Sequence, residues 1–344
     1  MELFGLSIAI LALFIGFGFV VGLLYGFFGM GGSFLVTPAL LVLGYPARVA
    51  IGSGMAFVFG TAIIAVIKHH GIGQVDYKLG ALMFVGLTAG IEGGRIIVFY
   101  LEELGTAELI VGITYVVLLA AIGILFTKNA LEDDNEETEA DEELSHADVD
   151  PNDIPDIAKK IQRYNIPPMV TLTGGIRVSL WVITAVSLVV GIVSGFLGIG
   201  GGFIRLPAIY YLIGVPLPVA VGTNLFGGFI SGGVGAFTYG QAGAVDLTIV
   251  LPLLFGSALG AQIGSASTVV VDEDKTRIYF GLMLLIASVA VGIGEAGSIL
   301  EIPLLDTTSA VLIIGSAVVV ALIVIGSGVR AVKQQGRESP ILDK

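Results

Sequence analysis

Residues 26–38 read GFFGMGGSFLVTP, and residues 195–207 repeat this pattern as GFLGIGGGFIRLP. The two copies lie 169 residues apart and match at seven of thirteen positions: four glycines, two phenylalanines and the proline. In each copy the glycine cluster interrupts a long apolar run. Because glycine lowers helix stability by roughly 1 kcal/mol relative to alanine, such a cluster predicts a helix break or very close backbone packing.

The composition around these motifs is that of a membrane protein. The 344 residues are 55% hydrophobic and only 13% charged, and the mean hydropathy is +0.97. Mostly apolar runs of about eighteen residues or more recur along the chain, and such runs are typical of helices that span a bilayer. The sequence therefore predicts an all-α, polytopic integral membrane protein. It contains no cysteine, which excludes disulfides and thiolate chemistry.

The apolar segments form two halves that repeat each other. We expect helices in the first half at 3–28, 33–44, 49–67, 79–100 and 107–127, and in the second half at 177–198, 203–213, 219–238, 247–268 and 277–294. At an offset of 170, Asp76 coincides with Asp246 and Gly90 with Gly260, in a pattern that continues over some 70 residues. This pattern indicates an internal duplication, followed by an extra apolar segment at 309–329.

A strongly acidic stretch separates the halves. Thirteen of the 28 acidic residues lie between positions 132 and 156, where no Lys or Arg occurs. Without this stretch, 15 acids face 16 bases, so the net charge of −12 belongs to the linker. Such a segment is typical of solvated, disordered chain. The predicted parts are a first membrane repeat, a disordered acidic linker, a second membrane repeat, and an extra helix with a basic tail, at residues 1–127, 128–168, 169–296 and 297–344.

The second segment of each half decides the membrane topology. Twelve helical residues rise about 18 Å, which is less than the roughly 30 Å of a hydrocarbon core. If these short segments nevertheless cross, each half has five crossings and the halves are inverted. Every loop with Lys or Arg, except that of Arg48, then lies on one side of the membrane. This distribution predicts a protein of the cell membrane whose linker and C-terminus are cytoplasmic. The alternative is that they are re-entrant, which makes the repeats parallel but divides the basic loops between both sides.

The two predicted helix breaks are the main candidates for a binding site. Interrupted helices at matching positions of two halves point to the binding site of a transporter. The amide N–H groups at such a break can bind an anion without a basic side chain. The candidates are Gly29, Gly31, Gly32, Ser33, Gly198, Gly200, Gly201 and Gly202. The alternative is that these glycines only allow helices to pack closely.

Polar residues near the second break extend this hypothesis. Arg205 lies inside a short apolar run, and an arginine at membrane depth requires a partner or a wet cavity. The alternative is that its side chain snorkels to the membrane surface. Thr223 and Asn224 are expected to open the next helix, where they suit an N-cap or could donate hydrogen bonds to a substrate.

Glu92 and Arg95 lie in the middle of another apolar segment and share a helix face. They could form a structural ion pair. Alternatively, Arg95 contributes positive potential to an anion path while Glu92 takes up a proton that couples to transport. The sequence contains no HExxH motif and no Ser/His/Asp set within its apolar segments, so it predicts neither an enzyme nor a bound metal or cofactor.

The paired Gly-x-x-Gly-x-Gly-Gly…Pro motifs, with the Val-Ala-(Ile/Val)-Gly-(Ser/Thr) stretches at 49–53 and 219–223, resemble the sulfite exporter TauE/SafE family of membrane permeases. The resemblance covers nearly all of both membrane halves. It implies a secondary transporter for a small sulfur-containing or organic anion such as sulfite or a sulfonate. The expected partners are this anion, the lipid bilayer, a coupling proton or ion, and further copies in an oligomer, but no nucleic acid. An anion channel, or a membrane-embedded enzyme or receptor, is the alternative.

Overall fold

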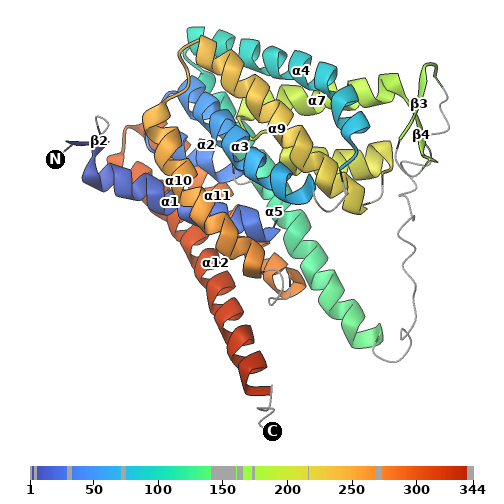
Figure 1. Cartoon of the computed structure of the whole chain (residues 1–344). Helices are drawn as coiled ribbons and strands as arrows, with labels where there is room; N and C mark the ends of the chain where they lie inside the picture. The colour runs from blue at the N-terminus through green and yellow to red at the C-terminus, as the bar shows by residue number, and fades with distance from the viewer. Residues whose placement is uncertain are drawn as a thin grey trace.

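The computed structural model describes residues 2–3, 6–28, 33–70, 75–140, 160, 166–172, 175–215, 217–267 and 273–338. Nearly all of them are helical (Figure 1). The first half contains α1 Ile8–Phe28, α2 Ser33–Val42, α3 Ala47–His70, α4 Tyr77–Glu103 and α5 Ala107–Ala140. The second half contains α7 Leu180–Leu197, α8 Gly202–Ala208, the π-helix η2 Ile209–Ile213, α9 Leu217–Gln241, α10 Leu247–Ser267 and α11 Glu273–Leu300, and α12 Pro303–Glu338 follows.

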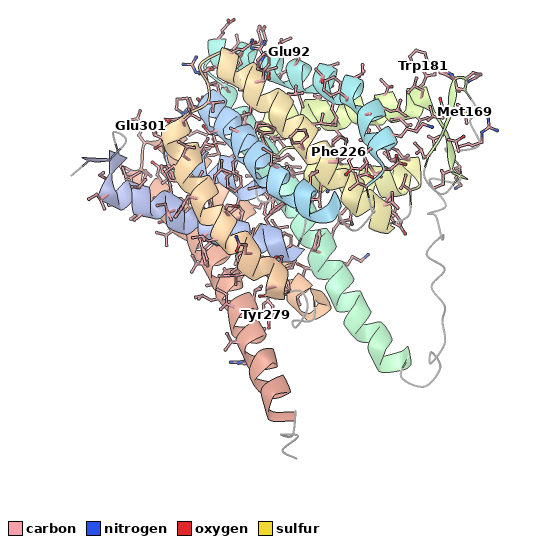
Figure 2. All side chains as sticks on the ribbon, viewed as in Figure 1. Glu92, Met169, Trp181, Phe226, Tyr279 and Glu301 are labelled. Atoms are coloured by element: carbon pink, nitrogen blue, oxygen red, sulfur yellow. The ribbon has the colours of Figure 1, made fainter. Side chains whose placement is uncertain are left out.

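The lengths of these helices confirm the predicted class of fold. In the described part of the chain, eight helices are long and apolar enough to cross a membrane. Large apolar side chains are exposed on the outside of the bundle, among them Phe237, Val319 and Trp181, the last of which is labelled in Figure 2. By contrast, α2 has 10 residues and α8 has seven, as the short segments predict. The structure is therefore an all-α, polytopic bundle with one short helix in each half.

Several predicted boundaries are wrong. The predicted disordered linker begins at residue 128, but α5 continues through Lys128 to Ala140. Ala, Leu and Glu are strong helix formers, and extending an existing helix needs no new nucleus. The linker residues 141–159 and 161–165 lie outside the described residues. In the same way, α12 continues past residue 329 into the basic tail.

Two short antiparallel hairpins were not predicted. Glu2–Leu3 (β1) pairs with Leu6–Ser7 (β2), so α1 begins at Ile8 and not at residue 3. Met169–Thr171 (β3) pairs with Arg177–Ser179 (β4), which occupies the start of the predicted 177–198 segment. Ser179 then caps α7 by accepting a hydrogen bond from the amide of Trp181 at 3.3 Å.

The first helix of each half packs along the fourth helix of the other half. Figure 1 shows α1 beside α10 and α4 beside α7. A Cβ atom added at Gly90 would lie 2.3 Å from the carbonyl oxygen of Leu188, and one added at Gly260 would lie 2.0 Å from that of Phe19. Only glycine permits such close backbone contact. The repeated glycines thus hold the two halves together by equivalent contacts, so the packing interpretation applies to these positions.

The equivalent helices α3 and α9 run antiparallel to each other. Met55 of α3 lies against Gly235 of α9, and Phe59 lies against Gly232. Residue numbers therefore rise along α3 in the direction in which they fall along α9. The rings of Phe59 and Phe229, which coincide at the offset of 170, lie 5.4 Å apart. The antiparallel direction of α3 and α9 is the one expected of inverted halves.

Two reciprocal hydrogen bonds repeat this relation. The amide of Asp76 donates to Thr223 Oγ1 at 3.0 Å, and the amide of Asp246 donates to Ser53 Oγ at 3.1 Å. Thr223 therefore connects the halves, and the prediction that it opens a helix is wrong because α9 already begins at Leu217. The equivalent α3 begins directly after Pro46, a residue that favours the start of a helix.

Candidate functional site

The second predicted helix break is present between α7 and α8. Gly198, Gly200 and Gly201 have φ angles of 72°, 62° and 73°, in the left-handed region that other L-residues rarely adopt. The chain therefore leaves α7 after Leu197 and starts a new helix at Gly202. The corresponding residues Gly29, Gly31 and Gly32 lie outside the described residues, where α1 has ended at Phe28 and α2 begins at Ser33.

The break frees backbone donors. The Gly201 carbonyl accepts hydrogen bonds from the amides of Ile204 at 3.1 Å and Arg205 at 2.7 Å. Within the described residues, the amides of Gly201 and Gly202 donate to no acceptor, and α8 has no side-chain cap. Amides inside proteins are almost always paired, so these two have donor capacity that no described residue uses.

Arg205 is fully buried beside the break, which argues against snorkelling. Its Nε donates to Asn224 Oδ1 at 3.0 Å and its Nη2 to the Asn224 carbonyl at 2.7 Å. Its Nη1 donates to the Gly200 carbonyl at 3.0 Å and to Ser231 Oγ at 3.1 Å. Every one of these acceptors is formally neutral, so the guanidinium is held in place while its charge is not cancelled.

No carboxylate of the described residues forms an ion pair with Arg205. An unpaired cation at membrane depth is energetically costly and usually marks an ion or substrate pathway. A bound anion would remove this cost. The electrostatics of the site therefore favour a negatively charged ligand.

A small cavity lies beside the guanidinium. The second half supplies Gly200, Gly202, Arg205 and Asn224 to its wall, whereas the first half supplies Tyr25, Val58, Thr61 and Ala62. The cavity measures about 20 Å³, which is room for about one water molecule. An anion of several heavy atoms can enter only after the surrounding helices move apart.

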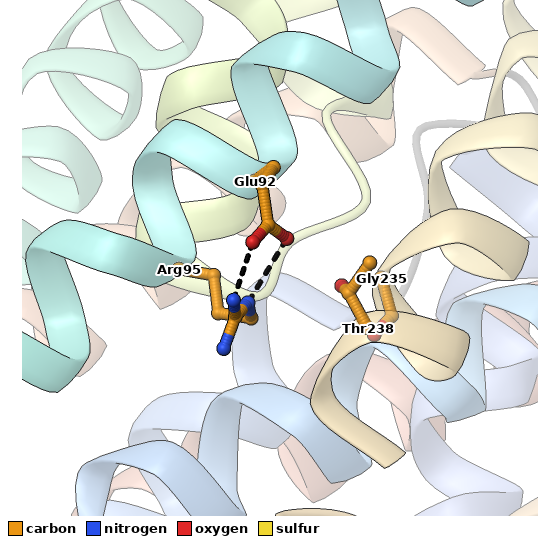
Figure 3. Close-up of polar contacts among 4 residues, drawn as sticks. All are labelled: Glu92, Arg95, Gly235 and Thr238. Atoms are coloured by element: carbon orange, nitrogen blue, oxygen red, sulfur yellow. Dashed lines mark hydrogen bonds and ion pairs between the residues drawn. The ribbon is translucent and has the colours of Figure 1, made fainter. Parts of the chain in front are cut away.

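Glu92 and Arg95 form an ion pair elsewhere in the bundle. Figure 3 shows the Arg95 guanidinium on the Glu92 carboxylate, with the Nε–Oε2 hydrogen bond at 2.9 Å and Thr238 of α9 opposite. The pair borders a separate pocket of about 200 Å³, to which neither Arg205 nor Asn224 contributes. The structure thus brings Asn224 to Arg205 but pairs Glu92 with Arg95 at a different pocket.

The sequence did not identify three residues that surround the guanidinium. Ser231 lies seven residues after Asn224, so the two share a face of α9, and this helical spacing was an available signal. Its counterpart in the first half, Thr61, also lines the cavity. Tyr25 belongs to α1, and no local pattern connects it with Arg205 because their proximity depends on how the halves pack.

A multi-pass bundle of apolar helices that encloses a buried arginine beside a small cavity at a helix break is the architecture of a membrane transporter. The chain belongs to the sulfite exporter TauE/SafE family, whose sequence pattern matches residues 14–291. This match confirms the family that the paired motifs indicate.

Named relatives agree with this class. The chain is 26% identical over 290 residues to a probable membrane transporter protein of Xylella fastidiosa (strain 9a5c). The aligned region covers 83% of this chain and 96% of the relative. It is 24% identical over 258 residues to the probable membrane transporter protein YunE of Bacillus subtilis, covering 72% and 85%. These names describe transporters and not enzymes. No solved structure matches the chain.

Proposed function

We propose that this protein is a secondary transporter for small sulfur-containing or organic anions, such as sulfite or sulfonates, and that the anion binds in the Arg205 cavity. The observation that carries the proposal is a fully buried guanidinium whose hydrogen-bond acceptors are all neutral. The amides of Gly201 and Gly202, which donate to no acceptor within the described residues, add donors at the same break. Both features attract negative charge within a region of low dielectric constant.

The cavity favours a carrier over a channel. A channel requires a continuous open path, whereas this site has room for about one water molecule. Loading and release therefore require the walls to separate. Since these walls come from both halves, a movement of one half against the other would open the site to each side in turn.

The antiparallel packing of α3 against α9 supports two inverted halves. Residues 1–127 and 169–296 would then be the moving repeats, joined by a cytoplasmic linker. If the short helices were re-entrant, the equivalent long helices α3 and α9 would cross the membrane in the same direction. Their observed contacts have the opposite sense.

The topology can be tested with single cysteines because the natural chain contains none. Glu103 and Lys160 are both exposed, and inverted halves place them on opposite sides of the cell membrane. We expect a membrane-impermeant thiol reagent applied to intact cells to label Glu103→Cys but not Lys160→Cys, with both labelled after lysis. Equal labelling of the two variants in intact cells would contradict the proposed topology.

The location of the site can be tested by filling the cavity. A Cβ atom at Gly228 would lie 3.4 Å from Arg205 Nη2 and 3.7 Å from Ala62 Cβ, so alanine fits without backbone strain but occupies space beside the guanidinium. We expect Gly228→Ala to slow saturable uptake of radiolabelled sulfite into proteoliposomes at least roughly tenfold, which corresponds to about 1.4 kcal/mol.

Gly240→Ala is the matched control because it changes the same residue type in the same helix, where the nearest atom, Val245 Cγ2, would be 3.8 Å away. Both substitutions replace a glycine of α9 by alanine, so a general effect of the added methyl group would appear in both variants. Equal uptake by Gly228→Ala and Gly240→Ala would place the anion outside this cavity. Unsaturable uptake by the wild type would favour a channel.

A further inference from the structure

Tyr25 is the one tyrosine in the cavity wall, and its hydroxyl has no hydrogen-bond partner among the described residues. Tyr25 is half-buried, and two fully buried tyrosines behave differently. The Tyr239 hydroxyl donates to the Gly195 carbonyl at 2.7 Å, and the Tyr115 hydroxyl donates to the Leu197 carbonyl. Tyrosine hydroxyls inside proteins usually find such partners. The O–H of Tyr25 is therefore a hydrogen-bond donor that no described residue uses, and Tyr25 lies in the wall of the cavity.

Arg205 has an unused donor on the same cavity. A guanidinium carries five N–H groups in a planar fork, and four hydrogen bonds from Arg205 to described residues are accounted for. Nη1 uses both of its hydrogens, Nε uses its single hydrogen, and Nη2 uses one of two. The remaining N–H is on Nη2, the atom nearest to Gly228 in the cavity wall.

The two donors come from different halves of the protein. Tyr25 lies near the end of α1, whereas Arg205 lies in α8, and both residues line the same cavity. The duplicated chain does not repeat this arrangement. Ser194 occupies the position equivalent to Tyr25 and its hydroxyl lies 4.0 Å from Met55 Sδ, while Val36 occupies the position equivalent to Arg205. The duplication thus contributes a single tyrosine–arginine pair to the described part of the protein.

We propose that Tyr25 is a specificity-determining residue of the anion site, which donates its O–H to one oxygen of an oxyanion while Arg205 donates to another. This inference rests on the proposed function of the Arg205 cavity. The ligand class is a small oxyanion with at least two acceptor oxygens on one centre, such as a sulfite, a sulfonate or a carboxylate. A halide offers one centre and cannot satisfy two separated directional donors equally well.

Binding would also connect the two halves through the anion. The oxyanion would replace the missing partners of a donor on α1 and a donor on α8, so that the occupied site holds these helices together. In the empty site neither donor is satisfied by a described residue. A transporter needs such a difference between its loaded and empty states, because a ligand shifts an equilibrium only by its differential interaction with the two states.

Binding of sulfite and iodide to the purified full-length protein, measured by calorimetry in detergent, tests this inference. Loss of a hydrogen bond to a charged group should make Tyr25→Phe bind sulfite roughly ten- to a hundredfold more weakly, while its iodide affinity changes little. The ratio of the two affinities within one sample does not depend on the folded fraction. Tyr211→Phe is the matched control because Tyr211 is exposed on η2.

The outcomes separate this inference from the proposed function. An unchanged ratio of sulfite to iodide affinity in Tyr25→Phe, together with weaker binding by Arg205→Lys, would overturn the role of Tyr25 alone. Unchanged sulfite binding in both variants would overturn the anion site itself. Absence of sulfite and iodide binding by the wild type would overturn both.

Discussion

Asn224→Asp is expected to abolish anion transport while leaving the protein folded. Asn224 Oδ1 already accepts a hydrogen bond from Arg205 Nε at 3.0 Å, and a carboxylate has nearly the same shape as the amide. The introduced negative charge would therefore form an ion pair with the guanidinium inside a site of low dielectric constant. The substitution places a permanent anion beside the cation, so that a substrate no longer finds an unpaired positive charge.

We expect sulfite uptake into proteoliposomes to fall on the order of a hundredfold or more, since each 1.4 kcal/mol of lost binding is about tenfold. The melting temperature should stay the same or rise, because a charge-assisted hydrogen bond is stronger than a neutral one. Gln241→Glu makes the same amide-to-carboxylate change at the exposed end of the same helix and should transport normally. Wild-type uptake by Asn224→Asp would exclude Arg205 as the anion-binding cation.

Arg205→Ala is expected to remove both anion binding and part of the stability. The substitution leaves Asn224 Oδ1 without the donor that pairs it in the buried site, whereas the Gly200 carbonyl still accepts from Ser231 Oγ. Each unsatisfied buried group costs about 1–3 kcal/mol, so a lower melting temperature is expected. A loss of transport in this variant alone would therefore be ambiguous.

Arg205→Lys resolves this ambiguity because it keeps the positive charge with three donors instead of five. We expect it to bind sulfite more weakly than the wild type but to melt closer to it than Arg205→Ala does. Arg95→Ala is the second comparison, since Arg95 lies at the separate pocket and is already paired with Glu92. The site assignment is wrong if Arg95→Ala loses sulfite binding while both folded Arg205 variants retain it.

Local sequence patterns predicted much of the fold. The length of each apolar run indicated the membrane helices, and the duplicated glycine clusters indicated short helices after a break, which α2 and α8 confirm. The spacing of Glu92 and Arg95 indicated an ion pair, because residues three apart share a helix face. Boundaries were less accurate at α5 and α12, where charged helix formers extend an apolar helix.

The candidate site was predicted only in part. Arg205 stood out because an arginine within an apolar run needs an explanation from its surroundings. The same reasoning treated Arg95 and Thr223 as substrate ligands, but the structure gives Arg95 an adjacent carboxylate and gives Thr223 the Asp76 amide. Tyr25 carried no signal in the sequence, because a tyrosine in an apolar helix is ordinary until its neighbours are known.

The amino-acid sequence by itself determined the helices, their duplication and the break at Gly198–Gly201, because these depend on hydrophobic length and on the backbone freedom of glycine. Only the tertiary structure decided that α1 packs on α10, that α3 and α9 run antiparallel, and that Tyr25 and Asn224 share a cavity with Arg205. The physical reason is that each of these contacts joins residues far apart in the chain. Which glycine-bearing helix faces pack together depends on the complementary shapes of those faces, and the faces exist only once the helices have formed.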